Sequence, residues 1–221
     1  MITVALDSGG ADAARPWIER AHPSHPSLID RRHVVADLYQ MVNVPTAVWI
    51  DEDGVIVRPP ETPASGKMMA DLLGIETNAY LDAIRDWVAK GPASVHVPPP
   101  RERVARQHAP DSADALAAAN FRLGEYLFAH GDADAARPYF EEAMRLRPES
   151  WTYRRQAWAN YDPRQNAGRG WYEAMLETGD TPYYAPVRLG DALPPDDAEA
   201  ARRQRELLSA LIKPLLPPEG A

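Results

Sequence analysis

The sequence predicts a chain with an α/β first part and an all-α second part. Short apolar, β-branched segments and a hairpin pattern occur only in the first part, whereas the second part has helical spacing throughout. Several of the 22 prolines gather between the two parts. We therefore expect an α/β domain at 1–91, a proline-rich linker at 92–112 and a helical domain at 113–221.

The first part begins with a strand. Residues 2–6 are apolar on both faces and end at a turn of Asp-Ser-Gly-Gly, which is typical of a parallel strand covered by helices. The segment from Asp51 to Gly54 predicts a hairpin turn between two further strands. The elements expected in the first part are strand 2–6, helix 11–21, extended segment 28–29, helix 33–42, strands 44–50 and 55–57, loop 58–66 and helix 77–90.

Five helical patterns follow the linker. The last of them begins after Pro194 and Pro195, at Asp196 and Asp197. Proline fits the first turn of a helix and a carboxylate caps its free N–H groups, so this order indicates a helix start. The five expected helices are 113–129, 134–147, 150–161, 168–177 and 196–213.

Cysteine is absent from all 221 residues. This excludes disulfide bonds, cysteine nucleophiles, iron–sulfur clusters and cysteine-bound zinc from the chemistry of this sequence. His22 and His25 lie three residues apart, but prolines keep them from sharing a helical face and no carboxylate cluster joins them. We expect no catalytic residue, no metal site and no cofactor within this sequence, and leave open whether the protein takes part in catalysis.

Charge and hydropathy narrow the class of partner. The formal net charge is −8, whereas nucleic-acid binding requires a concentrated basic face. No apolar run approaches the ~20 residues of a transmembrane helix, and the first residues lack the basic region and cleavage site of a secretory signal. We expect a cytoplasmic protein with a protein or peptide partner; the sequence leaves its oligomeric state open.

Part of the helical domain matches a known repeat. Six positions within 117–150 have the residue types and spacings of one helix–turn–helix unit: Leu123, Gly124, Ala136, Phe140, Ala143 and Pro148. The segment therefore resembles a tetratricopeptide repeat. We expect Gly124 and Ala136 to let two helices approach closely, and Leu123 and Phe140 to fill the space between them.

This resemblance implies that the helical domain binds a peptide or a protein. The basic and amide residues of the family's carboxylate clamp do not occur at the matching positions, where Ala118, Phe121 and Glu125 lie. We expect a partner to contact Phe121, Glu125 and Phe128. The alternative is a packing or dimerisation module with no separate ligand.

The first part carries a second resemblance. Val44-Pro45-Thr46, followed by an apolar strand and the acidic hairpin that ends at Gly54, resembles the matching region of bacterial TlpA/ResA-like thioredoxins. The resemblance covers residues 2–90 and implies a thioredoxin-like fold with a cis peptide bond before Pro45. It also implies that Val44, Pro45 and Thr46 bind an extended substrate segment by strand addition. The alternative is a turn that only leads into the strand.

The chain departs from that family in one large respect. The first core strand and the reactive helix, which carries Cys-x-x-Cys or a selenocysteine variant, have no counterpart here, so we expect an incomplete domain that is redox-inactive by itself. We favour the body of a thiol–disulfide oxidoreductase whose reactive motif is encoded upstream, within about 40–80 residues. The alternative is a non-catalytic interaction or scaffold protein that uses its thioredoxin-like and tetratricopeptide surfaces.

Overall fold

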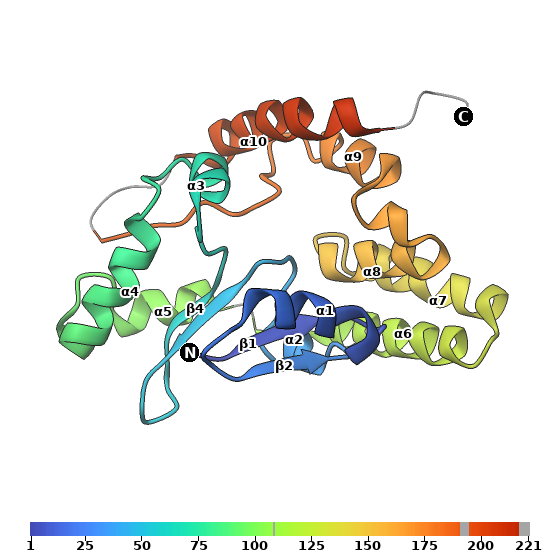
Figure 1. Cartoon of the computed structure of the whole chain (residues 1–221), viewed down its shortest axis with the longest axis horizontal. Coiled ribbons are helices and arrows are strands. Elements are labelled where there is room, and N and C mark those ends of the chain that lie inside the picture. Colours follow the sequence, from blue (N-terminus) through green and yellow to red (C-terminus); the bar gives the residue numbers. More distant parts are fainter. Residues whose placement is uncertain (108, 191–194, 217–221) are drawn as a thin grey trace. The chain divides into compact units, whose positions relative to one another are not determined.

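The computed structural model describes residues 1–107, 109–190 and 195–216 (Figure 1). The chain is mixed α/β, with small sheets and a larger share of helix, as the sequence predicts at this coarse level. It divides into two compact units, and each unit combines a segment from the first half of the chain with one from the second. Unit 1 comprises 1–42 and 109–166, and unit 2 comprises 43–108 and 167–221.

The two units differ from the domains expected at 1–91 and 113–221. Each unit takes residues from both sides of the expected linker at 92–112, so that segment does not separate the compact parts of the chain. The physical reason is that residues far apart in sequence pack together inside each unit: His33 lies against Phe121 in unit 1, and the helix at Lys67–Leu73 contacts that at Asp197–Ile212 in unit 2. None of the described helices is both long and apolar enough to cross a membrane.

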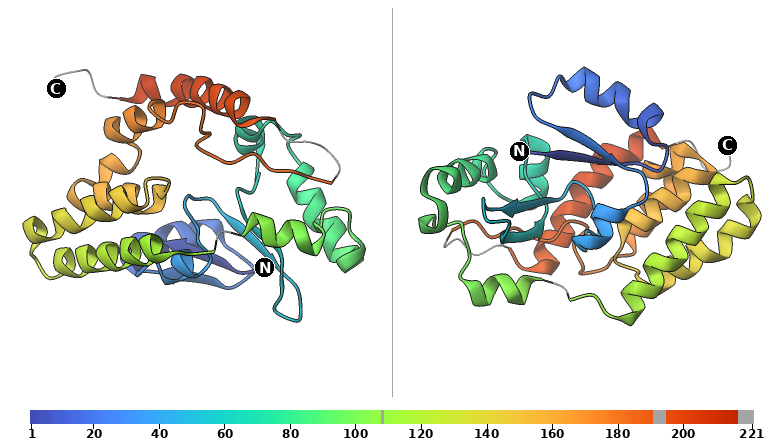
Figure 2. Two further views of the ribbon diagram at one scale, coloured as in Figure 1. Left: turned by 180° about the vertical axis from the view of Figure 1, so that it is seen from behind. Right: turned by 90° about the horizontal axis from the view of Figure 1, so that it is seen from below.

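Unit 1 begins with a parallel pair of short strands. β1 (Thr3–Leu6) pairs with β2 (Ser27–Asp30), and α1 (Ala11–Ala21) makes the crossover that a parallel pair requires (Figure 2). A short helix, α2 (Val34–Leu38), follows β2. The strand, helix and extended segment expected over this region are confirmed, and the second helix is shorter than expected.

Three further helices complete unit 1. They are α6 (Ser112–Ala129), α7 (Ala133–Leu146) and α8 (Trp151–Tyr161), with a 3-10 turn at Pro163–Ala167. Each helix has a side-chain cap at its start, from Asp111, Asp132 and Ser150 respectively. All three helices begin and end within one residue of the expected positions. Their starts could be placed because the capping residues are local in sequence.

Small residues let α6 and α7 pack closely. Gly124 and Ala136 are buried, and a Cβ atom on Gly124 would lie only 2.8 Å from the Phe140 ring. The expected role of Gly124 is therefore confirmed. Leu123 was expected between the helices but is 41% exposed, and Phe121 packs there instead, with its ring centroid 5.7 Å from that of Phe140. Two residues turn a helix by about 200°, so an offset of two places Leu123 on the opposite face.

Unit 2 contains an antiparallel hairpin and several helices. β3 (Ala47–Ile50) pairs with β4 (Ile56–Glu61), and the Asp51 side chain accepts the N–H groups of Asp53 and Val55 in the turn between them. The expected hairpin is therefore confirmed. The helices are α3 (Lys67–Leu73), α4 (Ala79–Lys90), α5 (Pro100–Arg106), α9 (Arg169–Leu176) and α10 (Asp197–Ile212), with 3-10 turns at Gly91–Ala93 and Lys213–Leu215.

Proline-rich segments in unit 2 are more ordered than the sequence predicts. β4 continues into the expected loop at 58–66, although it contains Pro59 and Pro60. The strand has β3 as its only strand neighbour in the described chain, and a strand edge tolerates the loss of an N–H group. α5 lies within the expected linker at 92–112 and begins with Pro100, at a position where a helix does not use the N–H group.

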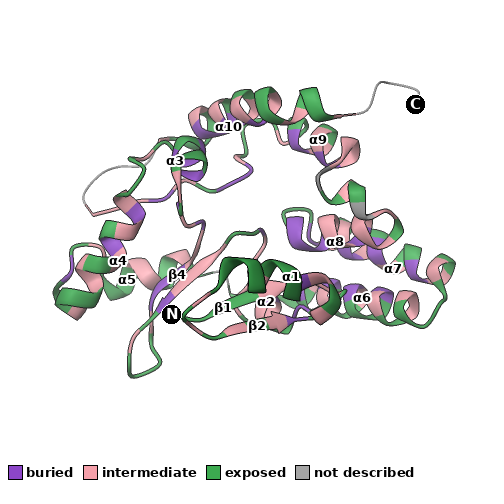
Figure 3. Cartoon of the chain, viewed as in Figure 1, coloured by how far each residue is buried: buried purple, intermediate pink, exposed green. Residues whose placement is uncertain are grey.

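A buried arginine lies at the centre of unit 2. Arg58 is 1% exposed, and its guanidinium forms an ion pair with Glu61. The same guanidinium donates to the carbonyl oxygens of His96, at 2.7 Å, and of Arg188, at 2.5 Å. β4 is accordingly buried in part of its length in Figure 3. The arginine therefore joins the hairpin to two loops that are far from it in sequence.

Aromatic side chains complete this polar core. Trp49 lies opposite Arg58 in the strand register, and its ring is 5.1 Å from the guanidinium carbon. The Tyr80 hydroxyl accepts from Trp49 Nε1 at 3.0 Å and donates to Glu61 at 2.9 Å. Burial, assisted by the Glu61 charge, raises the pKa of Tyr80, so the hydroxyl remains a donor at neutral pH. Trp49 and Arg58 of the hairpin are thus enclosed by partners of their own unit, whereas the turn is exposed.

Candidate functional site

Polar side chains gather in unit 1 where its two parallel strands end. Asp7 and Ser8 follow β1, and Asp30 and His33 lie at the end of β2 and just beyond it. The carboxyl ends of parallel strands meet at one edge of a sheet, and this edge is where α/β proteins most often bind ligands. These residues and the side chains of α6 and α8 that reach them form the candidate site.

A directed chain of hydrogen bonds joins β1 to α6 through α8. The backbone N–H of Ser8 donates to Gln156 Oε1 at 3.5 Å, and Gln156 Nε2 donates to Asn160 Oδ1 at 2.8 Å. Asn160 Nδ2 then donates to the Glu125 carboxyl. Burial raises the pKa of Glu125, and the charge of nearby Asp7 acts in the same direction. This chain of hydrogen bonds fixes the end of β1 against the helices.

On the β2 side, Asp30 caps a helix. It is 7% exposed, and its two carboxylate oxygens accept the N–H groups of Val34 at 2.9 Å, Val35 at 2.7 Å and Ala36 at 3.3 Å. These are the free donors of the first turn of α2. A carboxylate at this end also interacts favourably with the helix dipole. Asp30 is therefore occupied by the fold and is not available as a base or ligand.

His33 is the least expected residue of the site. It is 1% exposed, its ring lies 4.7 Å from that of Phe121, and neither ring nitrogen has a hydrogen-bond partner among the described residues. Burial lowers its pKa to about 4, although the charges of Asp30 and Asp37 oppose the shift. At neutral pH the imidazole is uncharged and packs as an aromatic ring. Nothing in its sequence context distinguishes it from a surface histidine.

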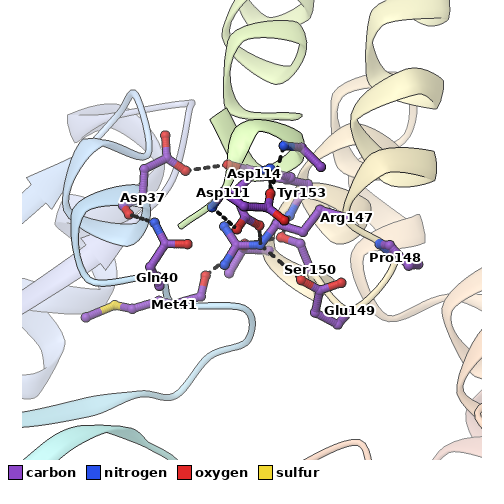
Figure 4. A network of polar contacts seen from close by, with 12 residues as sticks. Asp37, Gln40, Met41, Asp111, Asp114, Arg147, Pro148, Glu149, Ser150 and Tyr153 are labelled. Carbon is purple, nitrogen blue, oxygen red and sulfur yellow. Dashed lines mark hydrogen bonds and ion pairs between the residues drawn. The ribbon is translucent and has the colours of Figure 1, made fainter. Parts of the chain in front are cut away.

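Asp37 joins α2 to the helices (Figure 4). Its carboxylate accepts from Arg122 Nη2 at 2.7 Å and from the Tyr153 hydroxyl. Burial, together with the hydrogen bond to Asp37, raises the pKa of Tyr153. Tyr153 is therefore a protonated donor at neutral pH. This arrangement holds the helix that follows β2 against α6 and α8.

A second buried arginine supports the same region (Figure 4). Arg147 is 2% exposed, and its Nε atom lies 3.4 Å from Asp114 Oδ1 and 3.2 Å from Glu149 Oε1. Asp114 also belongs to the capping box of α6, in which it exchanges hydrogen bonds with Asp111. The buried charges of Arg147 and Asp114 compensate each other inside the unit, so their role in the geometry is structural.

The residues expected to bind an extended substrate lie in unit 2. The Val44–Pro45 peptide bond is cis, as the resemblance implied, and both residues are exposed. The Val44 N–H donates to Asn43 Oδ1 at 2.9 Å, and its carbonyl accepts from the Tyr184 hydroxyl at 3.3 Å. The Thr46 hydroxyl donates to the Asn43 carbonyl at 2.5 Å. A substrate strand at this position would have to replace the partners of Val44, and its binding there stays a prediction.

The three residues expected to meet a partner on the helical domain have different surroundings. Phe121 is 1% exposed and stacks on Tyr153, with ring centroids 4.3 Å apart, so this part of the expectation is corrected: its side chain belongs to the core. Glu125 receives the hydrogen bond from Asn160. The rings of Phe128 and Tyr161 meet edge to face, with their centroids 5.3 Å apart. The structure therefore brings Phe121 and Glu125 to the packed face of α6.

The opposite face of α6 carries a row that the sequence analysis missed. Leu116, Leu123 and Tyr126 are 51%, 41% and 59% exposed, and their spacing of seven and three residues places them along one side of the helix. The heptad spacing of large apolar residues was visible in the sequence. The same helix has a second apolar face, which packs on α7 and α8, so the sequence pattern alone does not show which face is exposed.

Comparisons with known proteins give no match for this chain. No family model matches it, no curated protein matches it, and no solved structure matches it. Any function assigned to the chain therefore depends on its own residues and their geometry.

Proposed function

We propose that this chain is a non-catalytic protein-binding module that combines a thioredoxin-like part with a tetratricopeptide-like helical hairpin. The observation that carries the proposal is the exposed apolar row Leu116, Leu123 and Tyr126 on α6. The other face of the helix is already packed, so the row has no role in the core of its own hairpin. Large apolar residues exposed along one helix face are typical of protein-interaction sites.

The spacing of the row favours a helical partner. Residues 116, 123 and 126 follow the a and d positions of a heptad, the pattern by which one helix packs along another. An amphipathic helix with a complementary apolar stripe would cover the row. The net charge of −8 and the absence of cysteine support protein binding over nucleic-acid binding or thiol chemistry. The competing hypothesis is a packing or dimerisation face with no separate ligand.

The proposal can be tested with displayed peptides. Peptides selected on the whole chain should bind in solution, and the double variant Leu123→Gln/Tyr126→Gln should weaken them about tenfold or more, since buried aromatic and aliphatic contacts dominate such interfaces. Glu141→Gln, at an exposed position of α7, is the matched control and should leave binding unchanged. Unaltered binding by the double variant, with its circular dichroism preserved, would refute the proposal.

A second candidate function is the body of a thiol–disulfide oxidoreductase. The order of a parallel pair (β1–β2), an antiparallel hairpin (β3–β4) and a following helix (α4) agrees with the order implied by the resemblance to TlpA/ResA-like thioredoxins. This function needs a thiol or selenol that the sequence does not contain.

An insulin-reduction assay separates the two candidates. The chain alone should match a protein-free blank, because it has no group that attacks a disulfide. A longer product of the same reading frame that carries Cys-x-x-Cys or selenocysteine should be active if the second candidate is correct. An inactive longer product, or an upstream region that encodes no such motif, would remove this candidate and leave the binding function.

A further inference from the structure

The parallel pair of unit 1 leaves one edge of β1 unpaired. The N–H of Thr3 donates to the Pro26 carbonyl at 3.1 Å, and that of Asp7 donates to the Asp30 carbonyl at 3.4 Å. Backbone groups of successive strand residues point to opposite sides, so those of Val4 and Leu6 point away from β2. In the described chain β1 pairs with β2 alone. These groups therefore form a free edge.

The side chains along this edge are apolar and open to solvent. Ile2 is 64% exposed and Val4 is 39% exposed, and no charged residue occurs before Asp7. Leu28, which lies opposite Val4 on β2, is 54% exposed. Natural sheets usually protect such an edge with charges, proline or a bulge, because an apolar edge pairs readily with another strand.

The outer edge of β2 is more charged than that of β1. The Pro26 carbonyl accepts from Thr3, so Pro26 faces β1, and the β2 residues that face outward are Ser27 and Ile29. Asp30 ends β2 and Arg31 and Arg32 directly follow it, whereas Asp7 alone follows β1. Charges beside an edge oppose the addition of a strand, so this difference points to β1 as the side from which this sheet can be extended.

The free edge is also held in place from within its own unit. Beyond β1, the Asp7 side chain accepts the Gly9 N–H at 2.8 Å, and the Ser8 N–H donates to Gln156 on α8. On the other side of the strand, the Thr3 hydroxyl lies 2.9 Å from that of Ser27. An ordered strand loses less conformational freedom when it gains a neighbour, which favours binding.

We propose that the edge of β1 formed by the backbone of Val4 and Leu6 is a strand-addition site that binds an extended, uncharged, β-branched segment of a partner protein. Unpaired N–H and C=O groups select an extended backbone, and the exposed Ile2 and Val4 side chains select apolar neighbours. A segment of about four residues matches the length of β1. A second copy fits less well, because each copy carries a net charge of −8.

This inference rests on the proposed function in requiring a protein partner, but it uses a different surface from the row on α6. The probe is a capped peptide of alternating threonine and valine with a lysine at each end. When it is added to the whole chain, the exchange of the Val4 and Leu6 amides should slow about tenfold or more. The same peptide N-methylated at every threonine and valine removes the backbone donors and should give no protection.

Two substitutions at one position test the edge itself. Val4→Pro removes the N–H that faces away from β2 and leaves the bonds of Thr3 and Asp7 to β2, so it should weaken probe binding about tenfold or more. Val4→Lys, which keeps the N–H but adds an edge charge, serves if the proline variant fails to fold. Leu28→Lys places the same charge opposite, on β2, and should change affinity less than about twofold.

Several results would overturn the inference. The first is that the probe peptide does not slow exchange of the Val4 and Leu6 amides. The second is that the N-methylated peptide binds as tightly as the probe. The third is that Leu28→Lys weakens probe binding as much as Val4→Lys does. A dimer that Val4→Lys dissociates would assign the edge to a second copy instead. If Leu123→Gln/Tyr126→Gln abolishes binding of the selected peptides while the probe never binds, the proposed function stands and this inference fails.

Discussion

The two small sheets of the molecule have opposite surroundings. β3–β4 buries Trp49 and Arg58, which face each other across the hairpin and are joined through Tyr80 and Glu61 to the rest of unit 2. In β1–β2, Asp30 is the one strand residue that is buried. Two strands by themselves are marginal in water, so each pair depends on what covers it. The hairpin has its cover within its own unit, whereas the parallel pair keeps an apolar edge open.

This difference assigns different roles to the two sheets. Substitutions in β3–β4 should damage folding, because they remove enclosed partners. Substitutions at the edge of β1 should spare folding and affect only the addition of a strand. The predictions below test this contrast from the largest expected effect to the smallest.

Replacing Arg58 should give the largest loss of stability. Arg58→Met leaves the Glu61 carboxylate, the His96 carbonyl and the Arg188 carbonyl without their guanidinium donor in a buried site. Removing one partner of a buried ion pair costs about 3–5 kcal/mol of unfolding free energy. Urea unfolding followed by circular dichroism measures the loss.

Two further variants define this effect. Adding Glu61→Gln to Arg58→Met should recover part of the loss, since it removes the unpaired charge. Arg85→Met, at an exposed ion pair with Asp82, should cost less than about 1 kcal/mol. Equal costs at Arg58 and Arg85 would show that the hairpin is not enclosed as described.

His33 should make the stability of unit 1 fall in mild acid. Its pKa is about 4 in the folded protein, against about 6.5 when unfolded, so the unfolded chain binds more protons between these values. The stability due to the neutral ring is complete above pH 6.5 and is lost as the pH falls toward 4, by about 3 kcal/mol in total. His33→Phe should remove this part of the pH dependence. Identical slopes of unfolding free energy against pH for the two proteins would contradict the assignment.

Gly124→Ala should destabilise the helical hairpin by about 1–3 kcal/mol. The added Cβ would meet the Phe140 ring at 2.8 Å, and this clash outweighs the better helix propensity of alanine. Phe140→Leu should make room for the methyl group, so that the double variant loses less than the sum of the single changes. A gain in melting temperature for Gly124→Ala would show that the helices are not in close contact there.

Val4→Lys should have the smallest effect on stability. The side chain is 39% exposed, and surface substitutions away from buried partners usually change the free energy of unfolding by less than about 0.5 kcal/mol. A loss comparable to that of Arg58→Met would mean that β1 is enclosed, and the contrast between the two sheets would disappear.

Local signals explain what the sequence predicted well. α6, α7 and α8 were placed to within one residue because Asp111, Asp132 and Ser150 cap them through hydrogen bonds that span a few residues. The turn between β3 and β4 was found for the same reason. The thioredoxin-like and tetratricopeptide-like assignments stay proposals, because no solved structure matches the chain.

Long-range partners explain what the sequence did not predict. Arg58 donates hydrogen bonds to carbonyl groups 38 and 130 residues away. These partners hold the start of the expected loop at 58–66 in place, and it forms part of β4. His33 and Phe121 are 88 residues apart in sequence, and no local pattern connects them. The helix spacing in α6 contained two apolar faces, and choosing between them required knowing which neighbours cover each face.

The openness of the β1 edge is most directly tested by amide hydrogen exchange of the whole chain. In the free protein the Val4 and Leu6 amides should exchange about tenfold or more faster than Asp7, which bonds to β2. With the threonine–valine peptide they should slow by at least about tenfold, while the Asp51 amide, bonded to Val55 in the hairpin, stays unchanged. The account would be contradicted if the Val4 and Leu6 amides already exchange slowly in the free chain, or if the peptide does not change their exchange rates.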